Sequence, residues 1–409
     1  MEENGRFLKG FFCGVCMMAA VGGLAFAVKD RAGEWLERQT GKAESSGEEL
    51  QVDVDEVEEK MGQIEDIINE YYLDEIDNDA VENQIYKGMI QGLGDSYADY
   101  YTQEELKKVQ ESNSGVYTGI GVALSQDADT GLITIVTCYE DTPAEEAGIL
   151  AGDVIYKVGD MEVTGEDLTK VVARIKQEEG ETVKLTVVRE GESDYLEFDV
   201  ERRDVEIPTV SHEMLEEQVG YIAISAFDAV TEQQFLSAKE DLEEQGMEKL
   251  VIDLRNNLGG VLDTVCNILN QMLPEGLIVY TEDKNGERTE YRSDGKNPFT
   301  LPLVVLVNGY SASASEIFAG AVKDYGIGTL VGTTTYGKGI VQRLFPLPDG
   351  TAVKMTIAKY YTPKGNDIHK VGVEPDVEVE LDEALRQKSV ISKEEDNQLQ
   401  KALEVLKGK

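Results

Sequence analysis

The sequence has little of what many common binding and catalytic sites require. It holds four cysteines and two histidines in 409 residues, and two of the cysteines lie within the first 20 positions. These numbers exclude a disulfide scaffold, a four-cysteine zinc site in the body of the chain and a histidine-rich metal site. Catalysis by histidine would have to use His212 or His369. We expect Cys138 and Cys266, which are far apart in the chain, to be buried thiols.

Basic residues are also scarce. Lysine and arginine total 38 against 80 aspartates and glutamates, which gives a formal net charge of −42. Such a surface repels phosphate backbones, so we expect no nucleic-acid partner, and it disfavours anionic lipid except where a segment inserts. At roughly 100–200 residues per domain, the length predicts two to four domains with a sizeable core.

A long apolar run lies near the N-terminus. Residues 11–28 carry no charge over 18 positions, after a polar segment 1–10 that contains two basic residues. The run is short for a membrane-spanning helix and long for the apolar part of a signal peptide, and residues 25–27 (Ala-Phe-Ala) fit a cleavage site. We predict a transmembrane signal anchor with residues 1–10 in the cytoplasm; a cleaved signal peptide and a buried helix of a soluble protein are the alternatives. The anchor and the signal peptide both place the rest of the chain outside the cytoplasm.

The remaining chain divides by its pattern into five segments. Residues 29–53 are polar and acidic, which is typical of a linker, and residues 54–112 show the apolar spacing of amphipathic helices. Residues 113–203 combine short β-branched runs with two helical stretches and predict a small α+β domain. Residues 204–385 contain continuous apolar runs followed by turns and helical patterns, which predicts an α/β core with strands buried on both faces. Residues 386–409 contain a further amphipathic helix.

The small domain contains a Gly-x-Gly turn that leads into a strand, at residues 117–122 (Tyr-Thr-Gly-Ile-Gly-Val). Together with residues 141–155, this turn resembles a PDZ domain of the bacterial, circularly permuted kind. The resemblance implies that backbone N–H groups of the turn bind the terminal carboxylate of a peptide with an apolar tail, which adds a strand beside it. A turn that only connects two strands is the alternative. The implied peptide-binding residues are Gly119, Ile120, Gly121 and Val122.

Two segments of the core carry candidate catalytic groups. An apolar strand at 303–307 leads through a turn into a helix rich in small residues, and Ser313 stands at the start of this helix. The unpaired N–H groups and the dipole of a helix N-terminus favour the negative charge of an oxyanion. Alternatively, Ser313 and Glu316 form a capping box and the serine has only that role. Lys338 lies between two glycines, and a lysine held in a dry pocket has a lowered pKa and can act as a general base.

Several motifs of the core together resemble the carboxyl-terminal processing peptidases, also called tail-specific proteases. They are the Ser-Ala-Ser-Ala-Ser-Glu-Ile run at 311–317, a lysine 25 positions after Ser313, and the segments 360–363 and 372–376. The resemblance covers residues 54–407. It implies an α/β crotonase-like serine protease core with an inserted PDZ domain, between helical N- and C-terminal segments.

The resemblance also implies roles for single residues. These are the nucleophile Ser313, the general base Lys338, Gln342, which holds the lysine, and the oxyanion-hole donors Gly260 and Ala314. Gly259 is an alternative donor to Gly260, and Leu258 stands where the family usually has proline before the two glycines. In some family members a basic residue late in the PDZ helix makes a regulatory contact when a substrate tail is bound, and Lys176 falls nearest that position. The helical end segments are where family members dimerise.

We therefore predict a membrane-anchored, extracytoplasmic serine endopeptidase with a Ser/Lys dyad. Its partners are protein or peptide substrates with apolar C-termini, the membrane through the N-terminal helix, and a second copy of the chain. No metal or organic cofactor is needed. Two alternatives remain: a PDZ scaffold with a catalytically silent core, and a Ser/His hydrolase that uses His369.

Overall fold

The computed structural model describes residues 50–176, 180–388 and 391–408. The chain forms two units, Met1–Ile76 and Asp77–Lys409. The apolar run 11–28, for which a membrane anchor is predicted, lies outside the described residues. Within the described ranges, no helix combines the length and the apolar character that crossing a bilayer requires.

The described helix of the first unit is α2 (Val54–Tyr71), which the spacing of apolar residues predicts. It begins at Asp53, whose side chain accepts the N–H of Glu56 at 3.1 Å and so caps the first turn. The apolar side chains that recur along the helix are exposed. They include Val54, Val57, Met61, Ile64 and Ile67.

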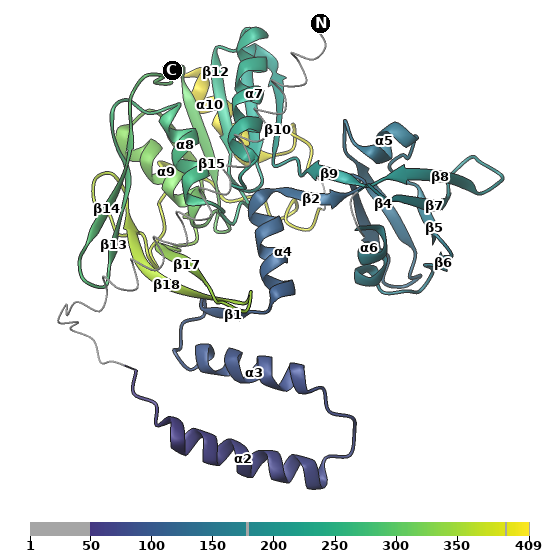
Figure 1. Ribbon diagram of the computed structural model, residues 1–409. Helices are drawn as coiled ribbons and strands as arrows, with labels where there is room; N and C mark the ends of the chain where they lie inside the picture. Colours follow the sequence, from purple (N-terminus) through teal and green to yellow (C-terminus); the bar gives the residue numbers. More distant parts are fainter. Residues whose placement is uncertain (1–49, 177–179, 389–390, 409) are drawn as a thin grey trace, which may run out of the picture. The chain divides into compact units, whose positions relative to one another are not determined.

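A six-stranded sheet forms the centre of the second unit (Figure 1). Its strands, in spatial order, are β10 (Val210–Leu215), β11 (Val219–Ile224), β12 (Lys249–Asp253), β15 (Leu303–Val307), β16 (Thr329–Gly332) and β19 (Val377–Glu378). All neighbours are parallel except β10 and β11, which are antiparallel and joined by a 3-10 turn (Glu216–Gln218). Every residue of β15 is buried, so the prediction of strands covered on both faces is confirmed.

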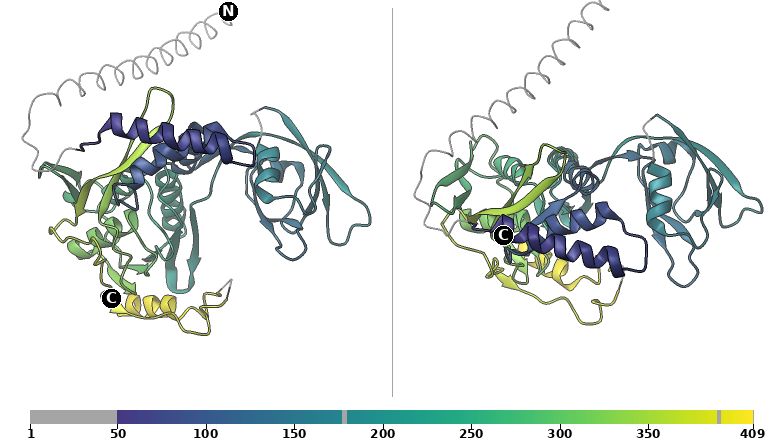
Figure 2. Two further views of the ribbon diagram at one scale, coloured as in Figure 1. Left: turned by 90° about the horizontal axis from the view of Figure 1, so that it is seen from below. Right: turned by 60° about the horizontal axis from the view of Figure 1, so that its bottom comes forward.

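Helices cover both faces of this sheet. Helices α7 (Thr231–Glu244), α8 (Leu262–Asn270) and α9 (Ala314–Tyr325) pack on one face. Helix α10 (Asn397–Lys407) packs on the other face, and Figure 2 shows it, in yellow, on the far side of the strands from the teal and green helices. Successive strand residues point to opposite faces, so Ile252 joins the first layer and Val251 the second.

A second, antiparallel sheet of five strands contains the segment that follows Lys338 in the chain. It consists of β1 (Asp99–Tyr101), β18 (Ala352–Tyr361), β13 (Gly276–Asp283) and β14 (Arg288–Ser293) in that order, with β17 (Ile340–Pro346) also paired to β18. Strand β1 lies between α3 (Asn78–Gln91) and α4 (Gln103–Ser114), in a segment for which the sequence predicts only helices. Three residues are too few to show an alternating pattern, so only the pairing with β18 reveals this strand.

The PDZ region forms its own sheet and core. The sheet order is β3 (Val122–Gln126), β4 (Ile133–Cys138), β5 (Val154–Val158), β7 (Thr182–Val188) and β8 (Leu196–Glu201), with β6 (Met161–Glu162) beside β5. Helices α5 (Pro143–Ala147) and α6 (Leu168–Lys176) pack on it. The chain enters through β2 (Val116–Gly119) and leaves through β9 (Arg203–Glu206), and these two strands pair with each other.

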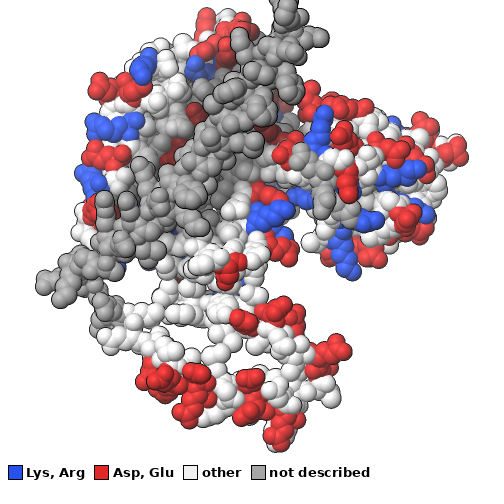
Figure 3. Space-filling model, in the orientation of Figure 1, with Lys and Arg blue, Asp and Glu red and all other residues white. Residues whose placement is uncertain are grey.

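The surface has the acidic character that the composition predicts. Figure 3 shows acidic side chains along α2 and α3 and over the PDZ region, on the face that it presents. The prediction of two buried thiols holds for Cys266 but not for Cys138, which is only partly buried because it ends strand β4 at the rim of the PDZ core.

Candidate active site

Ser313 directly precedes α9 and follows the buried strand β15 in the chain. Its backbone has φ 56° and ψ −114°, a strained conformation for a residue other than glycine. Its carbonyl accepts the N–H groups of Glu316 and Ile317 at 2.9 and 3.1 Å and the hydroxyl of Tyr360 at 2.9 Å. These bonds hold the turn in place, and the serine itself is half-buried at the wall of a pocket.

Two backbone N–H groups beside Ser313 are placed to receive an oxyanion. Ala314 is the first residue of α9, so its N–H has no acceptor within the helix. The N–H of Gly259 donates to Oδ1 of Asn257 at 2.8 Å. Among the described residues we find no acceptor for the N–H of Gly260 or of Ala314. The geometry therefore favours Gly260 over Gly259 as the second donor of the site.

The glycines allow this loop to approach the serine closely. A Cβ on Gly259 would lie 2.7 Å from Cβ of Ser313, and one on Gly260 would lie 2.4 Å from the carbonyl oxygen of Phe227. Their φ angles are 105° and 148°, which side chains rarely permit. Leu258, which precedes the two glycines, is 68% exposed and lines the pocket.

The two other serines of the Ser-Ala-Ser-Ala-Ser run bind the segment that leads to Gly259 and Gly260. Ser311 donates to the carbonyl of Leu254 at 2.7 Å, and Ser315 donates to the carbonyl of Asn257 at 2.9 Å. Both hydroxyls are fully buried, so each bond satisfies a group that would otherwise be costly. The loop that carries Gly260 is thus bound to the segment that carries Ser313.

Lys338 reaches the same pocket from the segment before β17. It is half-buried, and this burial, together with repulsion from Lys354, lowers the pKa of its ammonium group, while the Glu316 carboxylate acts in the opposite direction. Its Nζ lies 4.8 Å from the centroid of the Tyr97 ring, within the range of a cation–π contact. No hydrogen bond of this Nζ to another described residue is present. The lysine is thus held against an aromatic face.

Glu316 links the serine and lysine segments, a role that its place in a capping-box pattern does not reveal. Its side chain is fully buried and accepts four hydrogen bonds. The donors are the backbone N–H groups of Ser313 at 2.9 Å, Gly337 at 2.7 Å and Lys338 at 2.8 Å, and the hydroxyl of Thr335 at 2.6 Å. One carboxylate therefore sets the spacing between the two candidate catalytic residues.

Gln342 lies on β17, with its amide close to the lysine pocket but bonded elsewhere. Its Nε2 donates to Oγ1 of Thr356 at 3.4 Å, and the N–H of Thr356 donates to Asp95 at 3.3 Å. Asp95 also accepts the N–H of Tyr97 at 2.9 Å. Gln342 is therefore connected to the loop that carries Tyr97, and the sequence offers no signal for this connection.

One pocket of about 410 Å³ brings the predicted residues together. Ser313, Ala314, Gly260, Lys338 and Gln342 all line it. They come from segments separated by up to 82 positions, and the fold unites them at the carboxyl ends of the parallel strands, where α/β proteins commonly place their sites. Within the described part of the chain, no cluster of side chains suited to a metal ion is found.

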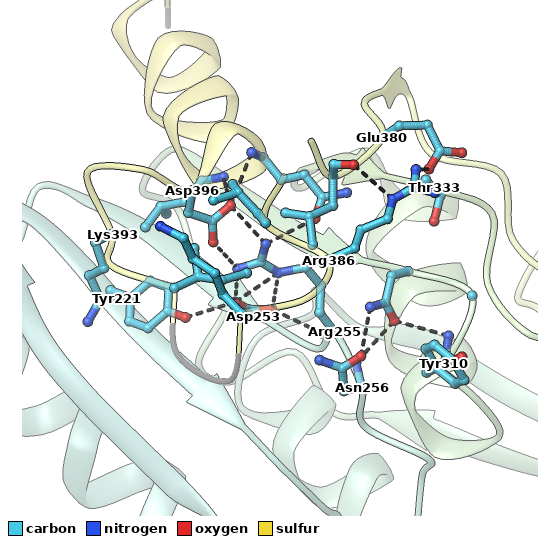
Figure 4. A pocket seen from close by; sticks show the side chains of 18 residues that line it. Tyr221, Asp253, Arg255, Asn256, Tyr310, Thr333, Glu380, Arg386, Lys393 and Asp396 are labelled. Atoms are coloured by element: carbon cyan, nitrogen blue, oxygen red, sulfur yellow. Dashed lines mark hydrogen bonds and ion pairs between the residues drawn. The ribbon is translucent and has the colours of Figure 1, made fainter. Parts of the chain in front are cut away.

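A second pocket, of about 730 Å³, is lined by Asp253, Arg255 and Asn256 of the segment that leads into the glycine loop (Figure 4). At its base, the guanidinium of Arg255 bonds Asp253 at 2.6 Å and Asp396 at 2.7 Å. The hydroxyl of Tyr221 donates to the same Asp253 at 2.8 Å. Because Asp396 also caps α10, this cluster ties the start of the loop to the C-terminal helix. We assign it a supporting role.

The PDZ groove occupies about 250 Å³ between β3 and α6. Three of the four predicted peptide-binding residues line it, namely Gly119, Ile120 and Val122, together with Val172 and Ile175 of α6. Gly121, the fourth, forms the turn with φ 87°. Lys176, at the end of α6, also lines the groove and pairs with Glu111 of α4 at 3.4 Å. The predicted regulatory lysine thus contacts a helix outside the PDZ core.

Neither histidine lines the Ser313 pocket. His212 lies on β10 with Nε2 2.8 Å from Asp241, and His369 packs against the backbone of Gly339 with Nδ1 buried and without a partner among the described residues. The geometry gives no support to a Ser/His arrangement.

The fold and the site define a serine-type peptidase with a PDZ domain. The profile of peptidase family S41 matches residues 218–379, and a PDZ domain profile matches residues 134–189. The carboxy-terminal processing protease CtpA of Bacillus subtilis is 34% identical over 343 residues, which cover 84% of this chain and 73% of that protein. A carboxyl-terminal-processing protease of Picosynechococcus is 36% identical over 321 residues, 78% of this chain and 77% of the relative.

Among solved structures, a photosystem II D1 C-terminal processing protease is 31% identical. The match covers 75% of this chain and 84% of that one, with a TM-score of 0.45. The chain belongs to the S41 carboxy-terminal processing proteases.

Proposed function

We propose that this protease cleaves peptide bonds with a dyad of Ser313 and Lys338, outside the cytoplasm. The observation that supports the dyad most directly is the shared carboxylate of Glu316, which binds the backbone N–H groups of both residues. Both side chains also line one pocket, which contains a pair of N–H groups without acceptors among the described residues.

In the proposed reaction, neutral Lys338 takes the hydroxyl proton of Ser313 as the serine oxygen attacks the peptide carbonyl. The N–H groups of Gly260 and Ala314 stabilise the negative oxygen of the tetrahedral intermediate. Lysine then gives the proton to the leaving amine, and an acyl-serine remains. Water, deprotonated by the same lysine, attacks this ester, and the lysine then returns the proton to the serine oxygen as the acid product leaves.

The dyad must change its arrangement before it reacts. Lys338 faces the Tyr97 ring and Gln342 bonds Thr356, so neither side chain is yet engaged with the serine. We infer that these contacts define a resting state. When substrate binds, Lys338 leaves the Tyr97 ring and Gln342 turns to hold the lysine.

The PDZ groove is proposed to select substrates by their C-termini. Its walls are formed by Ile120, Val122, Val172 and Ile175, which suit an apolar terminal side chain. The N–H groups of the preceding turn suit the carboxylate. We further propose that Lys176 exchanges its Glu111 partner when a tail binds and so reports occupancy.

Anchoring and dimerisation complete the proposal. The uncharged run 11–28 supports a membrane anchor that leaves the catalytic part outside the cytoplasm. The exposed apolar side chains of α2 support association with a second copy. Sedimentation of the full chain in detergent, compared with an Ile64→Asp variant, tests the dimer; equal masses for the two proteins would contradict it.

The function is tested by incubating the full-length protein in detergent with an unfolded model protein and separating the products. We expect cleavage by the wild type and by His369→Ala, and loss of at least about 10³-fold in Ser313→Ala and Lys338→Met. The opposite pattern for His369 and Lys338 would replace the dyad with a Ser/His mechanism. Peptide binding without cleavage by the wild type would favour a PDZ scaffold.

A further inference from the structure

Tyr117 lies inside the PDZ groove, although it belongs to the entry strand β2. It lines the groove together with Ile120 and Val122. Its ring packs against Gly119, since a Cβ on Gly119 would lie only 2.5 Å from its Cε2. Real Cβ atoms do not come so close, so the first glycine of the turn is what admits the ring.

The phenolic oxygen of Tyr117 lies near the N–H groups of Gly121 and Val122, which favour its anionic form. Burial raises the pKa of Tyr117 to about 12, an effect that these two N–H groups oppose, so the phenol is neutral at physiological pH. The same two N–H groups belong to the set that we propose for the carboxylate of a bound tail.

The carbonyl groups of the turn are already engaged, so its N–H groups keep their direction. Ala144 N–H donates to the carbonyl of Ile120 at 2.9 Å, and Tyr139 N–H donates to that of Gly121 at 3.0 Å. A ligand oxygen must therefore compete with Tyr117 for the same donors.

Lys176 lies over the ring of the tyrosine. Its Nζ lies 4.7 Å from the centroid of the Tyr117 ring and 3.4 Å from the carboxylate of Glu111. A cation over an aromatic face is attractive, and the Glu111 contact keeps the lysine there. Tyr117 is thus held between the turn and a basic side chain.

We propose that Tyr117 is an internal occupant of the carboxylate-binding turn, which the free terminal carboxylate of a substrate tail must displace. This proposal rests on the proposed function of the PDZ groove. A carboxylate makes stronger hydrogen bonds to N–H groups than a neutral phenol does, so it wins the site, whereas an uncharged amide does not. A ligand binds only those molecules in which Tyr117 has left the turn. The apparent affinity is therefore the intrinsic affinity multiplied by the fraction of molecules with an open turn.

The competition defines the ligand as a peptide with both a free carboxylate and an apolar terminal segment. Apolar contacts with Val172 and Ile175 must add to the carboxylate contacts before Tyr117 leaves. Internal loops of folded proteins, which offer no terminal carboxylate, are excluded. Displacement also moves a side chain of β2, the strand that pairs with β9 where the chain enters and leaves the PDZ region.

The test measures peptide binding to the full-length Ser313→Ala protein, which removes cleavage from the measurement. The probe is a fluorescent decapeptide that ends in Ala-Leu-Val, with either a free carboxylate or a terminal amide, and the readout is fluorescence anisotropy. Tyr117→Phe keeps the ring on Gly119 and removes only the competing oxygen. We expect it to bind the free-carboxylate peptide about 5- to 10-fold more tightly, because the turn is then open in a larger fraction of the molecules.

Tyr195→Phe is the matched control, because Tyr195 stacks on Tyr156 within the PDZ region and does not line the groove. It should bind the peptide as the parent protein does, and the amide peptide should bind weakly to all variants. Equal or weaker binding by Tyr117→Phe, with the carboxylate preference intact, would overturn the Tyr117 proposal alone. Absence of a carboxylate preference in every variant would overturn it together with the proposed PDZ function.

Discussion

The molecule contains two sites in which backbone N–H groups are arranged for a negative oxygen. In the core the donors are Gly260 and Ala314, and in the PDZ region they follow Gly119. Both turns need glycine, since a Cβ on Gly260 would meet Phe227 at 2.4 Å and one on Gly121 would meet Thr142 at 2.3 Å. The difference lies in what faces the donors: the described residues leave the core donors open, whereas the Tyr117 ring lies against the PDZ turn.

This difference fits the two proposed tasks. A site for a transition state works best when its donors are fixed and vacant, because no rearrangement is then needed during the reaction. A site that senses a ligand benefits from a competitor, because occupancy then depends on a ligand strong enough to displace it. Under the proposed function, the same backbone arrangement would serve catalysis in one place and selection in the other.

The largest expected effect comes from removing the carboxylate that holds the core site together. Glu316→Ala would leave the N–H groups of Ser313, Gly337 and Lys338 buried without an acceptor. We expect a loss of about 3 kcal/mol or more in the free energy of unfolding, and activity below detection. Urea denaturation measures the first quantity. Glu240→Ala, on the exposed side of α7, is the control, and a Glu316 variant as stable as this control would refute the role of the carboxylate.

The second test addresses the vacant donors. Gly260→Ala should lower kcat by about 10²- to 10³-fold, because the new Cβ collides with Phe227 and turns the N–H away from the oxyanion. Gly286→Ala controls for backbone strain alone, since Gly286 also has a positive φ, of 78°, but open space around it. If steady-state kinetics with a peptide substrate gave equal kcat values for both variants, the donor would have to be another N–H group.

The third test concerns the apolar wall of the PDZ groove. Val172→Asp places a carboxylate where the tail's own carboxylate and apolar side chain bind, so we expect the half-maximal concentration of a stimulating peptide to rise about tenfold. Ala173→Asp adds the same charge on the exposed side of α6 and should have little effect. Equal peptide dependence of protein cleavage in the two variants would mean that this groove does not control the protease.

The smallest expected effect is a shift of the pH profile. Burial and the nearby Lys354 lower the pKa of Lys338, so its neutral, basic form appears at lower pH than for an exposed lysine. Lys354→Met removes the repulsion and should move the rising limb of kcat/KM to higher pH, whereas Lys359→Met, on the same strand but exposed, should not. A limb that stays in place in both variants would exclude Lys338 as the titrating base.

The lowered pKa also has a consequence for stability. The unfolded chain binds the Lys338 proton more tightly than the native protein does. The contribution of this residue to stability therefore improves as the pH rises from the native pKa towards about 10.4. In thermal melts at neutral pH, Lys338→Met should have a higher Tm than the wild type. The difference in Tm should shrink at alkaline pH.

Contiguous patterns allowed much of the fold to be predicted. The run 303–307 becomes the fully buried β15, and the segments around Ser313 and Lys338 reach one pocket, as their motifs imply. Residues without a local pattern could not be predicted in this way. Strand β1 is visible only through its pairing with β18, and the contact between Tyr97 and Lys338 joins positions 241 apart.

The sequence by itself determined which groups are available: a serine at a helix start, a lysine between glycines, and two glycine turns. These features are local, because helix starts, strands and turns follow from neighbouring residues. Only the tertiary structure decided what those groups contact, namely the Glu316 carboxylate, the Tyr97 ring and, in the PDZ turn, Tyr117. Such contacts depend on packing between distant segments, and packing alone decides whether a donor is left open or covered.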